Sequence, residues 1–293
     1  MQTQNIILKK FIGLVLGTLA TISFTAQGYA ALYASTAAGG LGELYVINPA
    51  TGGLAQDVGP LTDGVSVNYA VTGLAFNPIT GLLYGSTGNA NAATAAKLIS
   101  INPNTASVTV IGSFAAGNAG NPATMADIAF DSSGNLFGIG SVGGPQLYSI
   151  NLFTGKATLI GGTGLTSTSG GGLAISSGGL LYGTPTATRF GTYDPNTGAF
   201  ANIASPNLPV GGAYAALSFD AAGVLYGLDL GPGPALLSHL VTINPNTGAV
   251  TDIGQSITSL DAIAFQPVPE PRTVALLLGS GAVAFLTHLR RRK

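Results

Sequence analysis

Three short phrases, each repeated five times, predict an all-β fold, a five-bladed β-propeller made of four-stranded blades. The third phrase recurs at intervals of 54, 45, 44 and 46 residues, and one propeller blade takes about 40–50 residues. Within each repeat, apolar and polar residues alternate, and Asn-Pro or Gly interrupts the runs, as strands and hairpin turns require. The composition agrees, because 44 of the 293 residues are glycine and tight turns favour glycine.

Each repeat is expected to supply four strands. The third phrase is a short apolar run that we assign to the first strand: 74–76, 128–130, 173–175, 217–219 and 263–265. The first phrase, a Leu followed by an aromatic and a small residue, is assigned to the second strand: 32–34, 83–85, 136–138, 181–183 and 225–227. The second phrase has Asn or Asp as its fourth residue and is assigned to the third strand: 45–49, 99–103, 148–152, 191–195 and 241–245. In one repeat the third and fourth strands are predicted at 146–151 and 156–160.

The two ends of the repeat region predict how the ring closes. The region begins in a second strand, at 32–34, and ends in a first strand, at 263–265. The last strand can therefore complete the first blade, which removes exposed sheet edges. A parallel β-helix is the alternative fold, but its rungs would be nearer 20 residues, and two hairpin turns per repeat favour blades.

Most of the repeated polar and aromatic residues are expected to be structural. Asx side chains that begin turns bond their own backbone, a role expected of Asn48, Asn102, Asn151, Asp194, Asn244, Asp131 and Asp220. The repeated Tyr and Phe rings are expected to pack between blades. The glycine after each aromatic is expected to allow close approach near the crowded centre.

Composition excludes several classes of protein. Charged residues make up only 7% of the chain, which excludes a nucleic-acid binder of the basic-patch kind. The absence of cysteine excludes disulfides, thiolate zinc sites and cysteine nucleophiles. Residues 31–268 hold three basic and ten acidic residues, a net charge of −7, whereas both ends of the chain are basic. The ends therefore serve a different purpose from the middle.

The N-terminus is typical of a secretion signal at residues 1–30. Lys9 and Lys10 precede a 14-residue apolar run, Phe11–Phe24, which is too short to span a bilayer comfortably. Small residues at Gly28 and Ala30 suit cleavage by signal peptidase after about Ala30. We therefore expect residues 31–267 to form an exported propeller domain. An uncleaved N-terminal anchor is the alternative.

The C-terminal segment, residues 268–293, has three parts. The motif Val268, Pro269, Glu270, Pro271 is followed by an apolar stretch, Thr273–Leu289, and then by a basic tail of Arg290, Arg291, Arg292 and Lys293. Seventeen residues of helix span about 25 Å, enough for a thin hydrocarbon core. The basic tail would remain in the cytoplasm, so the propeller would lie outside.

This three-part tail resembles the PEP-CTERM sorting signal of Gram-negative bacteria. The resemblance implies recognition by an exosortase, a membrane cysteine protease thought to cleave near the Pro-Glu-Pro triplet. It further implies an inner-membrane-anchored precursor that then reaches the cell surface or extracellular matrix, commonly in species that make exopolysaccharide. Pro269 and Pro271 would keep Glu270 outside the helix, in an extended conformation. A permanent anchor with a chance triplet is the alternative.

Catalysis finds little support in the sequence. His239 is the one histidine between residues 31 and 268, and neither a Gly-x-Ser-x-Gly motif nor a pair of histidines at metal-binding spacing occurs. Asp127 and Asp261 begin first strands near the expected channel, but their different offsets within the repeat predict that they point to opposite faces. Asp63 and Asp229 are expected in loops, without a recognisable partner. We therefore expect neither a cofactor nor a metal.

A non-enzymatic binding or structural role in the cell envelope or matrix is the preferred hypothesis. The loops from each fourth strand to the next blade gather at one rim of a propeller and are rich in Ser, Thr, Asn and Gly. Tyr69 and Tyr214 are expected to be exposed in these loops, where their rings could contact the apolar face of a sugar. The negative charge favours a neutral exopolysaccharide as partner. The alternative is a polysaccharide-acting propeller hydrolase, which would need acids converging on the channel, one of them with a raised pKa.

Overall fold

A computed structural model describes residues 30–37, 42–65, 68–115, 124–140, 144–166, 171–232 and 237–267. The expected signal peptide, apart from Ala30, and the whole C-terminal segment 268–293 lie outside these residues. Within the described part of the chain, no helix is long and apolar enough to cross a membrane.

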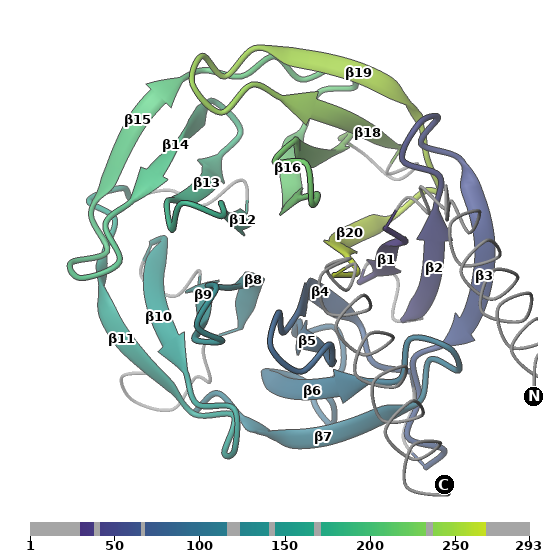
Figure 1. The fold of residues 1–293 in the computed structure, drawn as a ribbon. Coiled ribbons are helices and arrows are strands. Elements are labelled where there is room, and N and C mark those ends of the chain that lie inside the picture. The colour runs from purple at the N-terminus through teal and green to yellow at the C-terminus, as the bar shows by residue number, and fades with distance from the viewer. Residues whose placement is uncertain are drawn as a thin grey trace, which may run out of the picture.

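Five antiparallel sheets of four strands are arranged around a central axis, which confirms the predicted five-bladed propeller (Figure 1). Blade 1 consists of β20 (Leu260–Phe265), β1 (Leu32–Thr36), β2 (Glu43–Ile47) and β3 (Leu54–Pro60). Blade 2 consists of β4 (Val71–Phe76), β5 (Leu83–Thr87), β6 (Lys97–Ile101) and β7 (Val108–Ser113). Blade 3 consists of β8 (Met125–Phe130), β9 (Leu136–Gly140), β10 (Gln146–Ile150) and β11 (Ala157–Gly162).

The remaining two blades repeat the same order from the axis outward. Blade 4 consists of β12 (Gly172–Ile175), β13 (Leu181–Thr186), β14 (Arg189–Tyr193) and β15 (Phe200–Ala204). Blade 5 consists of β16 (Ala213–Phe219), β17 (Leu225–Leu230), β18 (Ser238–Ile243) and β19 (Val250–Gln255). The apolar first strands therefore surround the axis, and the more exposed fourth strands form the outer wall (Figure 1).

Blade 1 is completed by the two ends of the repeat region, as the sequence predicts. Strand β20 pairs with β1 in antiparallel register, with Leu32 opposite Phe265 and Ala34 opposite Ile263. The amide of Gln266 also donates to the carbonyl of Ala31 at 2.9 Å. Ring closure thus depends on hydrogen bonds between strands more than 220 residues apart in sequence.

Aromatic contacts join neighbouring blades, which confirms the expected packing of the repeated rings. The tyrosine of one blade's second strand meets the phenylalanine of the next blade's first strand at four of the five interfaces. Their ring centroids are 4.9–5.6 Å apart in the pairs Tyr33–Phe76, Tyr84–Phe130, Tyr182–Phe219 and Tyr226–Phe265. At the fifth interface, Phe137 packs in one apolar cluster with Ile175. Such pairs add about 0.5–1.5 kcal/mol each beyond the area they bury.

The turns also form as predicted. The side chain of each Asn or Asp predicted to begin a turn accepts a hydrogen bond, at 2.8–2.9 Å, from the backbone amide two residues further along the chain. These residues are Asn48, Asn102, Asn151, Asp194, Asn244, Asp131 and Asp220. The repeated second-strand glycines provide the expected close approach. A Cβ at Gly183 would lie 2.2 Å from Cε2 of Tyr193 in the next strand.

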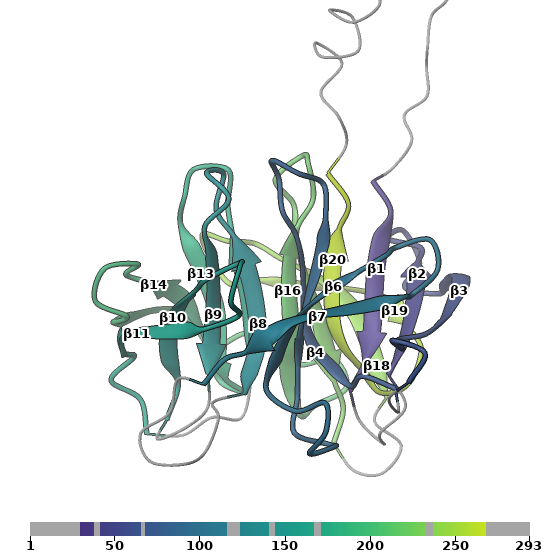
Figure 2. The ribbon, with the colours of Figure 1, turned by 90° about the horizontal axis from the view of Figure 1, so that it is seen from below.

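The two described chain ends lie together at one face of the ring. Strand β1 starts and β20 ends at this face, which is uppermost in Figure 2. The first strands of all five blades run in the same sense, so they begin at the opposite face. The residues that begin these strands form the site described next.

Candidate functional site: the axial cavity

A register irregularity marks the start of four of the five first strands. Pairing with the neighbouring strand skips one residue in each, namely Thr72, Ala126, Ala215 and Asp261. A β-bulge of this kind re-aims the side chain of the extra residue. These four residues and Gly171, which precedes β12, line one cavity on the axis. The four bulges and Gly171 together therefore draw the site from all five blades.

The cavity has a volume of about 380 Å³. It is lined by residues at the starts of the first strands, so it lies at the face opposite the chain ends. Besides the bulged positions, the residues around it include Asn89, Thr124, Met125, Tyr214 and Leu230, together with several Gly and Ala residues. Met125 and Tyr214 are fully buried behind the wall. Small residues at the bulges leave this space open. The one carboxylate among the lining residues belongs to Asp261.

Asp261 lies in an unfavourable environment for a charge. It is partly accessible at the cavity wall, yet protein surrounds it densely enough that burial raises its pKa to about 7. Burial is the one cause of this shift, and no described hydrogen-bond donor offsets it. Near neutral pH this carboxyl therefore changes between its neutral and charged forms.

Asp127 is fully buried and links three blades across the axis. Its carboxylate accepts backbone N–H bonds from Ile128 at 2.9 Å, Leu173 in blade 4 at 2.9 Å and Leu217 in blade 5 at 3.3 Å. The inner edge of a first strand has no neighbouring strand within its blade, so these amides need another acceptor. Burial raises the pKa of Asp127 well above its usual range, the three amides lower it, and the charge of Asp261 raises it further.

The expectation that Asp127 and Asp261 point to opposite faces is wrong. Both turn toward the axis, since Asp261 lines the cavity and Asp127 bonds inner strands of two other blades. Simple alternation along a strand fails here because the bulge at each strand start adds one residue. Thr72 has a related role, because its hydroxyl donates to the carbonyl of Met125 in the next blade at 2.6 Å.

Tyr69 and Tyr214 are buried, so the expectation that these rings are exposed is wrong. Their exposed fractions are 1% and 0%. The hydroxyl of Tyr69 donates to Asp63 at 2.8 Å, and that of Tyr214 donates to the carbonyl of Asn207 at 2.5 Å. Both rings pack into apolar clusters that join two blades. A sugar would find no exposed ring face at either position, although Tyr214 borders the axial cavity.

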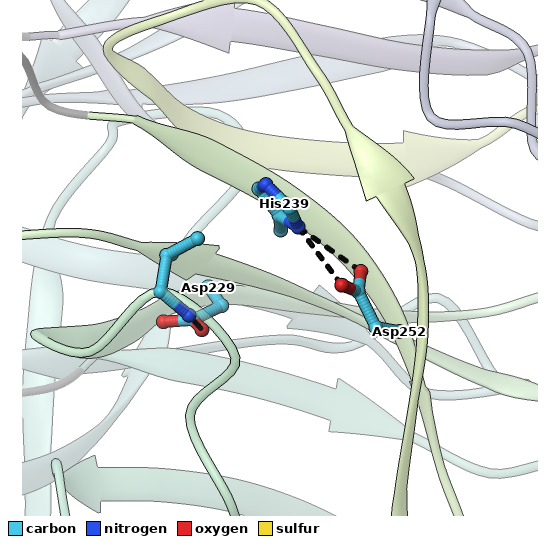
Figure 3. Close-up of polar contacts among 4 residues, drawn as sticks. Asp229, His239 and Asp252 are labelled. Carbon is cyan, nitrogen blue, oxygen red and sulfur yellow. Dashed lines mark hydrogen bonds and ion pairs between the residues drawn. The ribbon is translucent and has the colours of Figure 1, made fainter.

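His239 has acidic neighbours that the sequence did not reveal. Its Nδ1 lies 3.1 Å from both carboxylate oxygens of Asp252 on β19 (Figure 3). Asp229, expected in a loop, instead lies in β17 directly opposite His239, and it accepts a bond from the amide of Val210 at 2.9 Å. Burial raises the pKa of Asp229, while the Val210 amide and His239 lower it. This group ties three strands and a loop together at the side of blade 5.

The other predicted site residues lie outside the described chain. These are the sorting motif Val268, Pro269, Glu270, Pro271 and the basic tail Arg290, Arg291, Arg292 and Lys293. Among the residues that are described, no three His, Cys, Asp or Glu side chains come together as a metal site.

Three solved structures of similar shape are distant in sequence. A protein of unknown function from Bacteroides caccae has 12% identity and a TM-score of 0.44 over 81% of this chain and 98% of its own. A second protein of unknown function, from Bacteroides thetaiotaomicron, has 16% identity and a TM-score of 0.43 over 78% of this chain and 65% of its own. The PQQ-bound aldose sugar dehydrogenase of Streptomyces coelicolor has 14% identity and a TM-score of 0.45 over 70% of this chain and 73% of its own. Likenesses at this level carry no functional argument.

The sequence itself gives a family assignment. No curated protein matches it. A family model described as a repeat of unknown function, DUF6923, matches residues 58–226, from β3 into β17, which is more than half of the chain. The chain therefore belongs to the DUF6923 repeat family.

Proposed function

We propose that this protein is an exported cell-envelope or extracellular-matrix protein whose propeller is a non-enzymatic binding module. Its ligand would enter the axial cavity. Export would begin with signal peptidase and continue through exosortase recognition of the PEP-CTERM-like tail. The mature protein would then reside at the surface, or in the matrix, of a Gram-negative bacterium.

The position of the cavity relative to the chain ends carries this proposal. The amide of Gln266 bonds the carbonyl of Ala31, so both connections leave the ring side by side at one face. Asp261 and the other bulged residues lie at the starts of first strands, so the cavity that they line is at the other face. A propeller held at a membrane through its C-terminal segment would present the cavity away from that membrane, toward soluble or matrix ligands.

The order of parts in the C-terminal segment supports the sorting route. An apolar stretch at 273–289 followed by a basic end at 290–293 stops translocation with the basic end in the cytoplasm. The triplet at 269–271 would then be held at the outer membrane boundary. A membrane-embedded protease could reach it there, because the two prolines keep it out of the helix.

The arrangement of acids favours binding over hydrolysis. Glycoside hydrolysis commonly uses two carboxyl groups that both reach the substrate. Asp261 lines the cavity, and its raised pKa is the observation in favour of the hydrolase alternative. Asp127, the acid that interacts with it, is 0% exposed and holds three backbone amides. A single accessible carboxylate suits recognition of a ligand better than a two-carboxyl reaction.

The export part of the proposal is tested by the intact mass of the protein recovered from cells and medium of its native host. We expect a species that lacks about 30 N-terminal residues and ends near Pro269–Arg272. Glu270→Ala should leave the protein unprocessed in the membrane, whereas Gln266→Ala, just before the motif, should be processed normally. A wild-type protein that keeps Arg290–Lys293 and stays with the membrane would show that the tail is a permanent anchor.

The non-enzymatic part needs a separate measurement. The purified protein should release no reducing ends from neutral or acidic exopolysaccharide of the host. Release that is abolished by Asp261→Asn would instead establish the hydrolase alternative.

A further inference from the structure

The axial cavity has an imbalance of charge and of hydrogen-bonding groups. Its carboxylate, on Asp261, receives no hydrogen bond from the described residues. Asp127, close enough to interact with it electrostatically, adds a second acid. No basic residue is present among the described residues that line the cavity. In a domain whose net charge is already −7, the ionised site lacks any positive charge of its own.

Beside Asp261, the wall offers a hydroxyl oxygen that can accept a hydrogen bond from a ligand. The hydroxyl of Thr72 donates to the carbonyl of Met125 at 2.6 Å and lies 3.4 Å from the hydroxyl of Ser86. Its oxygen can accept one more hydrogen bond, from a ligand. Asn89 adds an amide group at the rim of the cavity. A ligand that complements this wall would bring hydrogen-bond donors and a positive charge.

We infer that the axial cavity binds a small organic molecule through a primary ammonium group, with the Asp261 carboxylate as its counter-ion. An ammonium group offers three donors and no acceptor, which matches a carboxylate beside acceptor oxygens. The Gly, Ala and Leu230 surfaces of the wall would contact the carbon skeleton. A volume of about 380 Å³ admits a single six-membered ring with its substituents.

A divalent cation is a poorer match for the same site. Calcium takes six to eight oxygen ligands, usually with several carboxylates. Here the oxygens of Asp127 are held by backbone amides, so Asp261 would be the one free carboxylate. This inference names the ligand class of the cavity and rests on the proposed binding role, but it is independent of the sorting route.

The test compares two ring-shaped probes that differ in charge, cyclohexylamine and cyclohexanol, by calorimetric titration of the full-length protein at pH 8. We expect cyclohexylamine to bind and cyclohexanol to bind at least tenfold more weakly. Asp261→Asn should lower the affinity for cyclohexylamine at least tenfold, because a charge-assisted hydrogen bond is lost. Asp57→Asn, which removes an exposed carboxylate from β3 of the same blade, should bind like the wild type.

The pH dependence gives a second readout. Asp261 must be ionised to bind the cation, and the titrating groups around it are Asp127 from β8 and Tyr214 from β16. Affinity for cyclohexylamine should therefore fall from pH 8 to pH 5.5 in the wild type and change less in Asp261→Asn. Equal binding of both probes, equal binding by Asp261→Asn, or binding of calcium chloride in preference to the amine would overturn the inference. Thermal unfolding of each variant checks that it is folded.

Failure of this inference is distinguishable from failure of the proposed function. If the amine does not bind but the processed protein is still recovered from the medium, the ligand class is wrong and export stands. If the amine binds but the tail is retained, the cavity assignment stands and the protein is a membrane-tethered receptor.

Discussion

Replacing Asp261 with asparagine should raise the free energy of unfolding at pH 8, because the folded protein ionises this carboxyl at a cost. Its pKa is about 7 in the fold, against 3.8 for an unperturbed aspartate. As the pH rises from about 4 to 7, the unfolded chain releases this proton while the folded chain keeps it, so stability falls through this range. Below pH 4 both states are protonated and the group contributes nothing. Asparagine lacks this dependence.

The size of the effect follows from the same difference. About three pH units at 1.36 kcal/mol each set an upper value of about 4 kcal/mol. Water reaches the cavity wall and screens part of the charge, so we expect about 2 kcal/mol at pH 8. Neutralising residue 261 also relieves the repulsion of Asp127, which acts in the same direction.

Urea unfolding of wild type and Asp261→Asn at pH 4.5, 6 and 8 measures this difference. The two proteins should be nearly equally stable at pH 4.5. The free energy of unfolding of the variant should then exceed that of the wild type by an increasing amount as the pH rises to 8. Asp57→Asn controls for the loss of one negative charge at an exposed position. Two stability curves that remain parallel across this range, or a variant less stable at pH 8, would refute the reasoning.

Three further substitutions test the packing of the ring by urea unfolding at pH 7. Asp127→Ala should lower the free energy of unfolding by about 2–4 kcal/mol, because two buried amides of other blades lose their acceptor. A loss under about 0.5 kcal/mol would mean that water replaces the carboxylate. Gly183→Ala should lower the free energy of unfolding by about 1–3 kcal/mol, since its Cβ would overlap a tyrosine ring. Gly162→Ala, where a Cβ would meet nothing within 4 Å, should have almost no effect. Equal effects of the two substitutions would contradict the close approach at Gly183. Ile263 is buried in the closing strand, and Ile263→Ala should lower the free energy of unfolding by about 2–5 kcal/mol, whereas Ile79→Ala at an exposed position should change it little. A small effect of Ile263→Ala would show that ring closure contributes little to stability.

The blades could be predicted because their signals are local. A turn-forming Asx, a following glycine and an alternating run of residues each act within a few positions of one another. Closure by β20 and β1 was predictable for a different reason. The first and last repeat fragments together make one complete unit, and an unpaired sheet edge is unfavourable.

The site was harder to predict because it depends on bulges and on contacts between blades. Counting along the strand placed Asp127 and Asp261 on opposite faces, and a single extra residue at each strand start invalidated that count. Tyr69 and Tyr214 follow loops rich in small polar residues, yet both are buried between blades. One signal was available: a carboxylate at the start of an apolar inner strand, where the inner sheet edge needs acceptors for its amides.

The measurement that tests the account most directly is the titration of Asp261 itself, by NMR of the protein labelled with ¹³C at aspartate side chains. Asp261→Asn identifies the resonance. We predict a midpoint of about 7 in the free protein and a lower midpoint when cyclohexylamine is present, because the bound cation stabilises the carboxylate. A midpoint near 4, or one that the amine leaves unchanged, would contradict the claim that the Asp261 carboxylate has no counter-ion in the free protein and binds a cationic ligand in the axial cavity.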